Sequence, residues 1–241
     1  MRKTYRAALV VFTLCLVASA QTVTVSSRKV TYTRPKPIAD FKKTFTIDHP
    51  KVRAATPALS RRIESAISHR TVLGLNLREE LNDIQWLEEA DFEVLYNRDG
   101  LLTIELRMSG TGAYPSGTAK TVVVDTRTGR KITPAMAFRD LRGLSAMIDK
   151  ALKREIAGAI VEIRSDPESK DLDVPNLFAG KRFSIKDLEG FAVKETGVEF
   201  SYDYGFAHVI QAYEPDGAFA FTWRELRPFI KPDGPLARFL R

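Results

Sequence analysis

The segment from Ser109 to Thr118, SGTGAYPSGT, contains Gly112 and Gly117 at the spacing found in phosphate-binding loops. Such a loop needs a lysine and then a Ser or Thr directly after the second glycine, because these side chains reach the phosphates and a magnesium ion. Here Thr118 and Ala119 follow Gly117, and the next residues have the pattern of a strand, not of a helix whose N-terminus would receive the anion. The segment therefore predicts a connection between two strands and no nucleotide site.

The chain has three histidines, and none belongs to a recognisable catalytic or metal-binding motif. His49, His69 and His208 do not form a His-Glu-x-x-His pattern, which would place two ligands on one helical face. A Gly-x-Ser-x-Gly segment is also absent, and this weakens a hydrolase interpretation. We predict no metal site and no cofactor, and we interpret each histidine first as a surface or hydrogen-bonded residue.

Carboxylates are numerous but match no known site. The segment 171–176, DLDVPN, has Pro175 at its fifth position and lacks the glycine that an EF-hand loop needs at its sixth. We interpret these acids as solvated loop residues and the acids of 88–93 as a polar entry to a strand. An alternative stays open, namely an envelope hydrolase or metal-dependent enzyme whose site combines dispersed carboxylates with His208.

The best candidate for a binding surface is the aromatic segment 201–215, SYDYGFAHVIQAYEP. Aromatic side chains on a loop give a large contact area at a small entropic cost, and they are enriched at the centres of interfaces. A further tyrosine beside Pro115 in the glycine-rich segment is exposed by its neighbours. The alternative is that alternate residues of 201–215 line the core of a strand pair. The candidate ligand-binding residues are Tyr114, Tyr202, Tyr204, Phe206, His208 and Tyr213.

The first twenty residues predict a signal peptide for export. Arg2, Lys3 and Arg6 precede an apolar run from Ala7, and the segment ends in a small-x-small cleavage pattern. The run is shorter than the about 20 apolar residues that span a bilayer, so we expect no membrane span after cleavage. Cys15 lies inside this segment, so the mature chain contains no cysteine. We expect a bacterial periplasmic or extracellular protein without disulfides.

The charge of the mature chain is too small to indicate nucleic acid as a partner. The whole chain has 37 basic and 30 acidic residues, a formal charge of +7. Removing the three basic residues of the signal segment leaves 34 against 30, or +4. Nucleic-acid-binding domains carry a much stronger basic excess. We therefore expect no nucleic acid as a partner.

The hydrophobic periodicity predicts hairpins interleaved with helices. Alternating apolar residues mark strands, and apolar residues at steps of three and four mark helices. This succession predicts an α+β fold of antiparallel sheet hairpins with a few helices packed on one face. We predict an N-terminal half, 21–117, and a C-terminal half, 118–241, that form one compact unit. The expected elements are strands over 21–32 and 39–48, helices over 57–70 and 73–86, a hairpin over 91–110, a strand over 118–125 with a turn at 126–129, a long helix over 144–163, a hairpin over 189–204 and a strand over 217–223.

The order of these motifs resembles a known exported domain. The segments YNRDGLLTIEL, GTGAYPSG and TVVVDTRTGRKITPAMAF, followed by a helix, are similar to the extracytoplasmic domain of RsiV-type anti-sigma factors. The same domain precedes the catalytic part of PdaC-type peptidoglycan deacetylases. The matching positions are Asp125, Thr128, Gly129, Lys131, Ile132, Thr133 and Phe138. The resemblance covers residues 30–226, and it departs from the family at Ala113-Tyr114, where Ala-His is common.

The resemblance implies a stand-alone binding or sensor module, with neither deacetylase nor anti-sigma activity. In the RsiV-type family such a domain receives a lysozyme-like protein, and in the deacetylases it accompanies cell-wall chemistry. The resemblance therefore implies a partner among envelope components, either a protein or a peptidoglycan fragment. Lysozyme-type ligands are basic, so a receptor with a positive net charge needs a local acidic surface to attract one.

Overall fold

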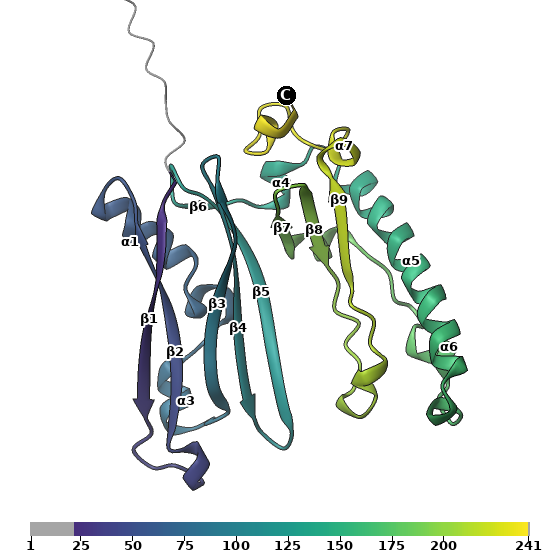
Figure 1. The fold of residues 1–241 in the computed structure, drawn as a ribbon, viewed down its shortest axis with the longest axis horizontal. Coiled ribbons are helices and arrows are strands. Elements are labelled where there is room, and N and C mark those ends of the chain that lie inside the picture. The colour runs from purple at the N-terminus through teal and green to yellow at the C-terminus, as the bar shows by residue number, and fades with distance from the viewer. Residues whose placement is uncertain (1–21, 241) are drawn as a thin grey trace, which may run out of the picture.

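The computed structural model describes residues 22–240, so the predicted signal segment of residues 1–20 lies outside the described residues. The described chain forms a six-stranded sheet of order β1-β2-β3-β4-β5-β6 and a three-stranded sheet of order β7-β8-β9, which lie side by side (Figure 1). Helices accompany both sheets. This architecture confirms the predicted α+β class.

The elements have the following bounds. The strands are β1 (Thr24–Thr33), β2 (Thr44–Arg53), β3 (Leu87–Arg98), β4 (Leu101–Thr111), β5 (Pro115–Asp125), β6 (Arg130–Lys131), β7 (Phe191–Val193), β8 (Gly197–Ser201) and β9 (Ala218–Thr222). The α-helices are α1 (Pro57–Ala66), α2 (His69–Leu73), α3 (Leu77–Asn82), α4 (Pro134–Ala137), α5 (Leu141–Ser165), α6 (Val174–Leu177) and α7 (Trp223–Leu226). Short 3-10 helices are η1 (Asp40–Lys42), η2 (Pro167–Ser169), η3 (Ile185–Glu189), η4 (His208–Tyr213) and η5 (Ala237–Leu240).

One pair of neighbouring strands is parallel, although the sequence predicts antiparallel hairpins throughout. Strands β2 and β3 pair in parallel, with Thr46 beside Glu89 and Ile47 beside Ala90. Parallel neighbours need a crossover connection, and the segment from α1 to α3 provides it. The other strand pairs in the described chain are antiparallel.

The crossover helices cover one face of the six-stranded sheet. Ile63 of α1 and Ile67, which follows it, are fully buried against Leu102 and Ile104 of β4 and Val122 of β5. Helix α1 begins where the sequence indicates, because the Thr56 side chain accepts a hydrogen bond from the Leu59 amide and Pro57 occupies the first turn. The apolar side chains of α1 therefore form a hydrophobic core together with this face of β4 and β5.

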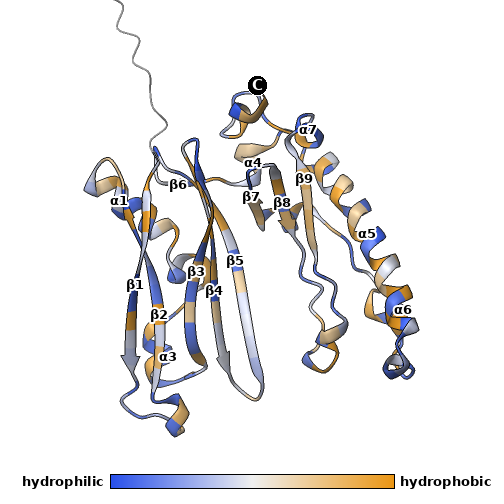
Figure 2. Cartoon of the chain, in the orientation of Figure 1, coloured by the Kyte–Doolittle hydropathy of each residue, from blue (hydrophilic) through white to orange (hydrophobic). Residues whose placement is uncertain are grey.

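The second sheet and α5 cover part of the opposite face. Leu101 and Val123 point to this side and share a core with Phe200 of β8 and with Ile148 and Leu152 of α5. Figure 2 shows hydrophobic colour on the half of β5 that lies nearer to β6 and polar colour on the other half. The core that the two sheets share therefore lies at the end of β5 nearer to β6. The predicted long helix is confirmed as α5.

The predicted division between residues 117 and 118 falls inside β5. The larger sheet continues past it to β6, and the core that contains Val123 extends from this sheet to β8. Residues of both predicted halves thus share one sheet and one core.

The hairpin between β3 and β4 gives a stability prediction. Its turn residues Asp99 and Gly100 have φ values of +53° and +72°, the left-handed region that a two-residue hairpin turn needs. We expect Gly100→Ala to lower the free energy of unfolding by about 1–2 kcal/mol, because a Cβ is unfavourable in this region. Urea denaturation would measure the change. Gly158→Ala is the control, because Gly158 lies inside α5 and an added Cβ would have no atom within 4 Å apart from the adjoining backbone of its own helix, and an unchanged or higher stability is expected there.

Candidate functional site

Two of the predicted binding residues meet although they are far apart in the sequence. Tyr114 lies in the tip of the hairpin between β4 and β5, and 63% of its surface is exposed. His208 begins η4 in the long connection between β8 and β9. Their rings stack with centroids 5.1 Å apart and planes inclined by 27°. The contact joins a loop of one sheet to a loop of the other.

Tyr204 is a core residue, which corrects its prediction as an exposed ligand-binding residue. Only 1% of its surface is exposed, and its hydroxyl donates a hydrogen bond of 2.6 Å to Glu155 Oε2 on α5. Burial, followed by the hydrogen bond to Glu155, raises the pKa of Tyr204. The ring also packs edge-on against Phe178. For Tyr204 the alternative interpretation of segment 201–215 is therefore correct, because its side chain lines the core.

The other predicted aromatic residues of this connection are half-buried. Tyr202 and Phe206 pack against the same core as Tyr204, and the Tyr213 hydroxyl donates to Asp166 Oδ2 at 3.2 Å. Val209, in contrast, is 85% exposed. The aromatic side chains thus fix the connection to α5, and its exposed part includes His208 and Val209.

Glycines allow the connection to fold back tightly. Gly217 has a φ of +62°, and a Cβ at this position would lie 2.1 Å from the Tyr202 carbonyl oxygen. Its amide donates to Glu155 Oε1 at 3.3 Å, so one carboxylate of α5 binds both ends of the connection through Tyr204 and Gly217. Helix α5 therefore anchors both ends of the connection that carries His208.

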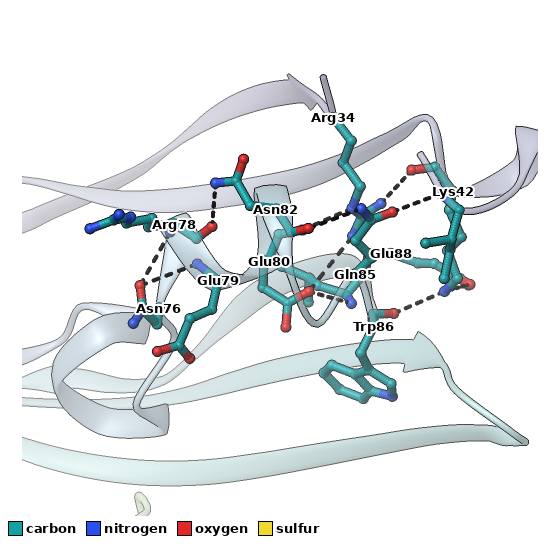
Figure 3. Close-up of polar contacts among 12 residues, drawn as sticks. Arg34, Lys42, Asn76, Arg78, Glu79, Glu80, Asn82, Gln85, Trp86 and Glu88 are labelled. Atoms are coloured by element: carbon teal, nitrogen blue, oxygen red, sulfur yellow. Dashed lines mark hydrogen bonds and ion pairs between the residues drawn. The ribbon is translucent and has the colours of Figure 1, made fainter. Parts of the chain in front are cut away.

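A tryptophan holds the hairpin that carries Tyr114. Trp86 Nε1 donates to Ser116 Oγ at 3.0 Å, and a Cβ on Gly110 would lie 2.0 Å from the Trp86 carbonyl oxygen, so the two backbones are in close contact. The same carbonyl accepts a hydrogen bond of 3.0 Å from Lys42 Nζ, which also pairs with Glu88 at 2.8 Å (Figure 3).

Behind Lys42 lies a buried arginine. The Arg34 guanidinium is enclosed and donates to the carbonyl oxygens of Glu80 at 2.9 Å, Lys42 at 2.7 Å and Leu87 at 2.7 Å (Figure 3). Its Nη2 also lies 3.6 Å from the Glu80 carboxylate. We call Arg34, Lys42, Glu80, Trp86 and Glu88 the arginine network. It ties the loop after β1 to the start of β3, and through Trp86 it supports the tip of the β4–β5 hairpin.

Two adjoining pockets form what we call the intersheet groove. They have volumes of about 410 and 430 Å³ and share Ala119 of β5. The pocket of about 410 Å³ is lined by residues of β3, β4 and β5 of the larger sheet. The pocket of about 430 Å³ lies between β5 and residues at and beside β7 and β8, and residues of α1 and α2 also line it. The Tyr114–His208 contact links the tip of the β4–β5 hairpin of the larger sheet to the β8–β9 connection of the smaller sheet. The charged lining residues are Glu89, Asp91, Glu105, Arg107, Lys120, Lys131, Glu189 and Glu199.

The groove is locally acidic although the whole chain carries a charge of +7. Its lining has five carboxylates and three cationic side chains. Arg107 contacts Asp91 at 2.7 Å, Glu93 at 3.2 Å and Glu105 at 3.7 Å, and the hydrogen bond to Asp91 is the largest cause that raises its pKa. One guanidinium cannot neutralise three carboxylates, so this wall keeps a negative charge.

The sequence interpretation missed Glu105, Arg107 and Ala119 as groove residues. The position of Glu105 and Arg107 on β4 could have been inferred from the hairpin turn, because the turn pairs Arg98 with Leu101 and fixes the strand register near it. If this register continued unchanged along β3, Asp91 would lie opposite Met108. A β-bulge between Val94 and Tyr96 shifts the register by one residue, so Asp91 lies opposite Arg107 instead.

The His208 ring stacks on the ring of Tyr114. No hydrogen bond or ion pair links it to a carboxylate within residues 22–240. In the same part of the chain, no group of three or more His, Cys, Asp or Glu residues is placed to hold a metal ion. None of the described helices combines the length and apolar character that crossing a bilayer requires.

The fold and the groove define a two-sheet α+β protein, and solved structures share this fold. A DUF3298 family protein from Pseudomonas aeruginosa is similar with a TM-score of 0.56 and 17% identity, covering 88% of this chain and 96% of that one. A DUF3298 family member from Bacteroides fragilis is similar with a TM-score of 0.57 and 11% identity, covering 92% of this chain and 99% of that one. No family model matches the sequence, and no curated protein matches it. At these identities the likeness establishes the fold, which is shared with proteins assigned to a domain of unknown function.

Proposed function

We propose that this protein is an exported, non-enzymatic binding domain that captures a component of the bacterial cell envelope in the intersheet groove. The observation that carries the proposal is the meeting of Tyr114 and His208 at the end of the groove. Exposed aromatic residues beside a concave surface are typical anchors of binding sites. The motif resemblance to RsiV-type and PdaC-type exported domains supports the same class of function.

The charge of the groove favours a basic protein ligand over a peptidoglycan fragment. The carboxylates around Arg107 provide the local acidic surface that the net charge of the chain does not. Opposite charges across an interface steer association and favour the correct partner. A lysozyme-like muramidase fits this requirement, and it is the envelope ligand that we propose.

Replacement of Tyr114 tests the proposal. We expect mature protein, residues 21–241, to retain a lysozyme-type protein from a panel that also includes cell-wall fragments. Tyr114→Ala should weaken this binding by about 1–3 kcal/mol, because an aromatic anchor is lost while its exposed position leaves the fold intact. Surface plasmon resonance would measure the affinities.

The control is Phe41→Ala, which removes another exposed aromatic side chain, in the middle of η1. This variant should bind as the unchanged protein does. Failure of folded protein to bind any member of the panel, or equal losses from both variants, would refute the proposed function. Hydrolysis of a cell-wall fragment by the protein would instead support the alternative of an envelope hydrolase that uses His208.

A further inference from the structure

The edge of β5 that borders the intersheet groove is open. Strand β6 pairs only with Val124 and Asp125, and the Ile132 amide donates to the Val123 carbonyl oxygen at 2.8 Å. The backbone groups of Val123 therefore point away from β4. Because backbone direction alternates along a strand, Thr121 and Ala119 present their N–H and C=O groups to the groove as well.

This open edge has a charged side and an apolar side. On one face, Thr121 lies opposite Glu105 and Ala119 lies opposite Arg107 with its surrounding carboxylates. On the helix-covered side of the edge, the pocket is lined by Ala66, Thr71 and Val72 of the crossover helices and by Lys120 of β5. A ligand lying along the edge would meet carboxylates on one side, and on the other side it would meet apolar side chains beside one lysine, so only the first side attracts basic residues.

The facing wall leaves space beside this edge. It includes the small residues Gly190, Ala192 and Ser201, and the pocket between the walls has a volume of about 430 Å³. The carboxylates on this wall already have cationic partners, since Glu189 lies 3.4 Å from Lys131 and Glu199 lies 3.3 Å from Lys194. The free negative charge therefore lies beside β5, and not across from it.

We propose that an extended protein segment with alternating basic and apolar residues binds as an added strand along residues 117–121 of β5. Successive side chains of a strand point to opposite faces, so the basic ones would meet the carboxylates near Arg107 and the apolar ones would meet Val72. Strand addition satisfies the open backbone groups and gives specificity through alternate side chains. This inference rests on the proposed binding function and names the part of the ligand that the groove holds.

Proline at position 119 tests the backbone contact directly. The Ala119 amide points into the groove, so Ala119→Pro removes a donor from the open edge and leaves the hydrogen bonds to β4 in place; edge strands tolerate proline at such positions. A fluorescent, end-blocked peptide of alternating lysine and valine serves as the probe, and fluorescence anisotropy measures its affinity. We expect Ala119→Pro to weaken binding about five- to tenfold through the lost hydrogen bond, and Ala119→Ser, which keeps the amide, to bind normally.

Charge reversal provides a second test that does not depend on proline. We expect Glu105→Lys to weaken binding of the lysine–valine peptide and to strengthen binding of a glutamate–valine peptide. The strand-addition proposal is overturned if the unchanged protein binds neither peptide, if it prefers the glutamate–valine peptide, or if folded Ala119→Pro and Glu105→Lys both bind the lysine–valine peptide normally. Retained capture of a lysozyme-type protein in these cases would leave the proposed function standing without strand addition.

Discussion

Replacement of Arg34 by leucine is expected to lower the free energy of unfolding by about 3–5 kcal/mol, the effect typical of breaking a buried ion pair. Arg34 is 2% exposed and Glu80 is 6% exposed. The guanidinium donates to three carbonyl oxygens and lies beside the Glu80 carboxylate. Leucine would fill part of the space but would leave these acceptors without their donor. The Glu80 carboxylate would keep its hydrogen bond from the Leu87 amide but lose its cationic partner, and this buried charge is a large part of the expected loss.

Urea denaturation followed by circular dichroism would measure this change. The matched control is Arg28→Leu on β1, the strand directly before Arg34, because Arg28 is exposed and its replacement should alter stability by less than about 0.5 kcal/mol. Glu80→Leu combined with Arg34→Leu should recover part of the loss, since the charge is then removed together with its partner. Equal stabilities of the two arginine variants would show that the arginine network does not stabilise the fold.

The arginine network also links stability to the binding site. Lys42 contacts the Trp86 carbonyl oxygen, and the Trp86 indole binds Ser116 at the base of the tip that carries Tyr114. A variant that loosens Arg34 therefore has a path of direct contacts to the end of the intersheet groove. We infer that a buried polar network is retained here because it positions this hairpin.

The elements with strong local signals were predictable from the sequence. The run from Leu144 to Ile160 keeps an apolar residue at every fourth position, and α5 contains all of it. The Asp99-Gly100 turn requires left-handed backbone, which glycine favours, so the hairpin around it could be located. In each case a few neighbouring residues determine the structure.

The features that depend on distant contacts were not predictable in this way. The bulge at Val94 changes which residues of β3 face the groove, and no local pattern marks it. The parallel pairing of β2 and β3 depends on how the crossover helices pack. Arg34 also gave no signal, because an arginine is normally exposed and only its three carbonyl partners from separate segments explain its burial.

Tyr204 shows the same limit, and it leads to the second large stability effect. We expect Tyr204→Ala to lower the free energy of unfolding by about 3–5 kcal/mol, as for other large aromatic side chains removed from a core. The ring fills space against Phe178, and its hydroxyl binds Glu155. Tyr204→Phe keeps the ring and removes the hydroxyl, so a smaller loss of about 1–3 kcal/mol is expected from the carboxylate left without this donor.

Comparison with Tyr114 separates a core tyrosine from a binding tyrosine of similar sequence surroundings. Both residues lie near glycine in aromatic or glycine-rich segments, but Tyr114 is 63% exposed and Tyr204 is 1% exposed. Tyr114→Ala should therefore weaken ligand capture at unchanged stability, whereas Tyr204→Ala should lose stability first and capture only through it. Thermal denaturation and binding measured on the same samples would distinguish the two. A Tyr204→Ala protein of normal stability that no longer binds ligand would contradict the core assignment and return Tyr204 to the binding surface.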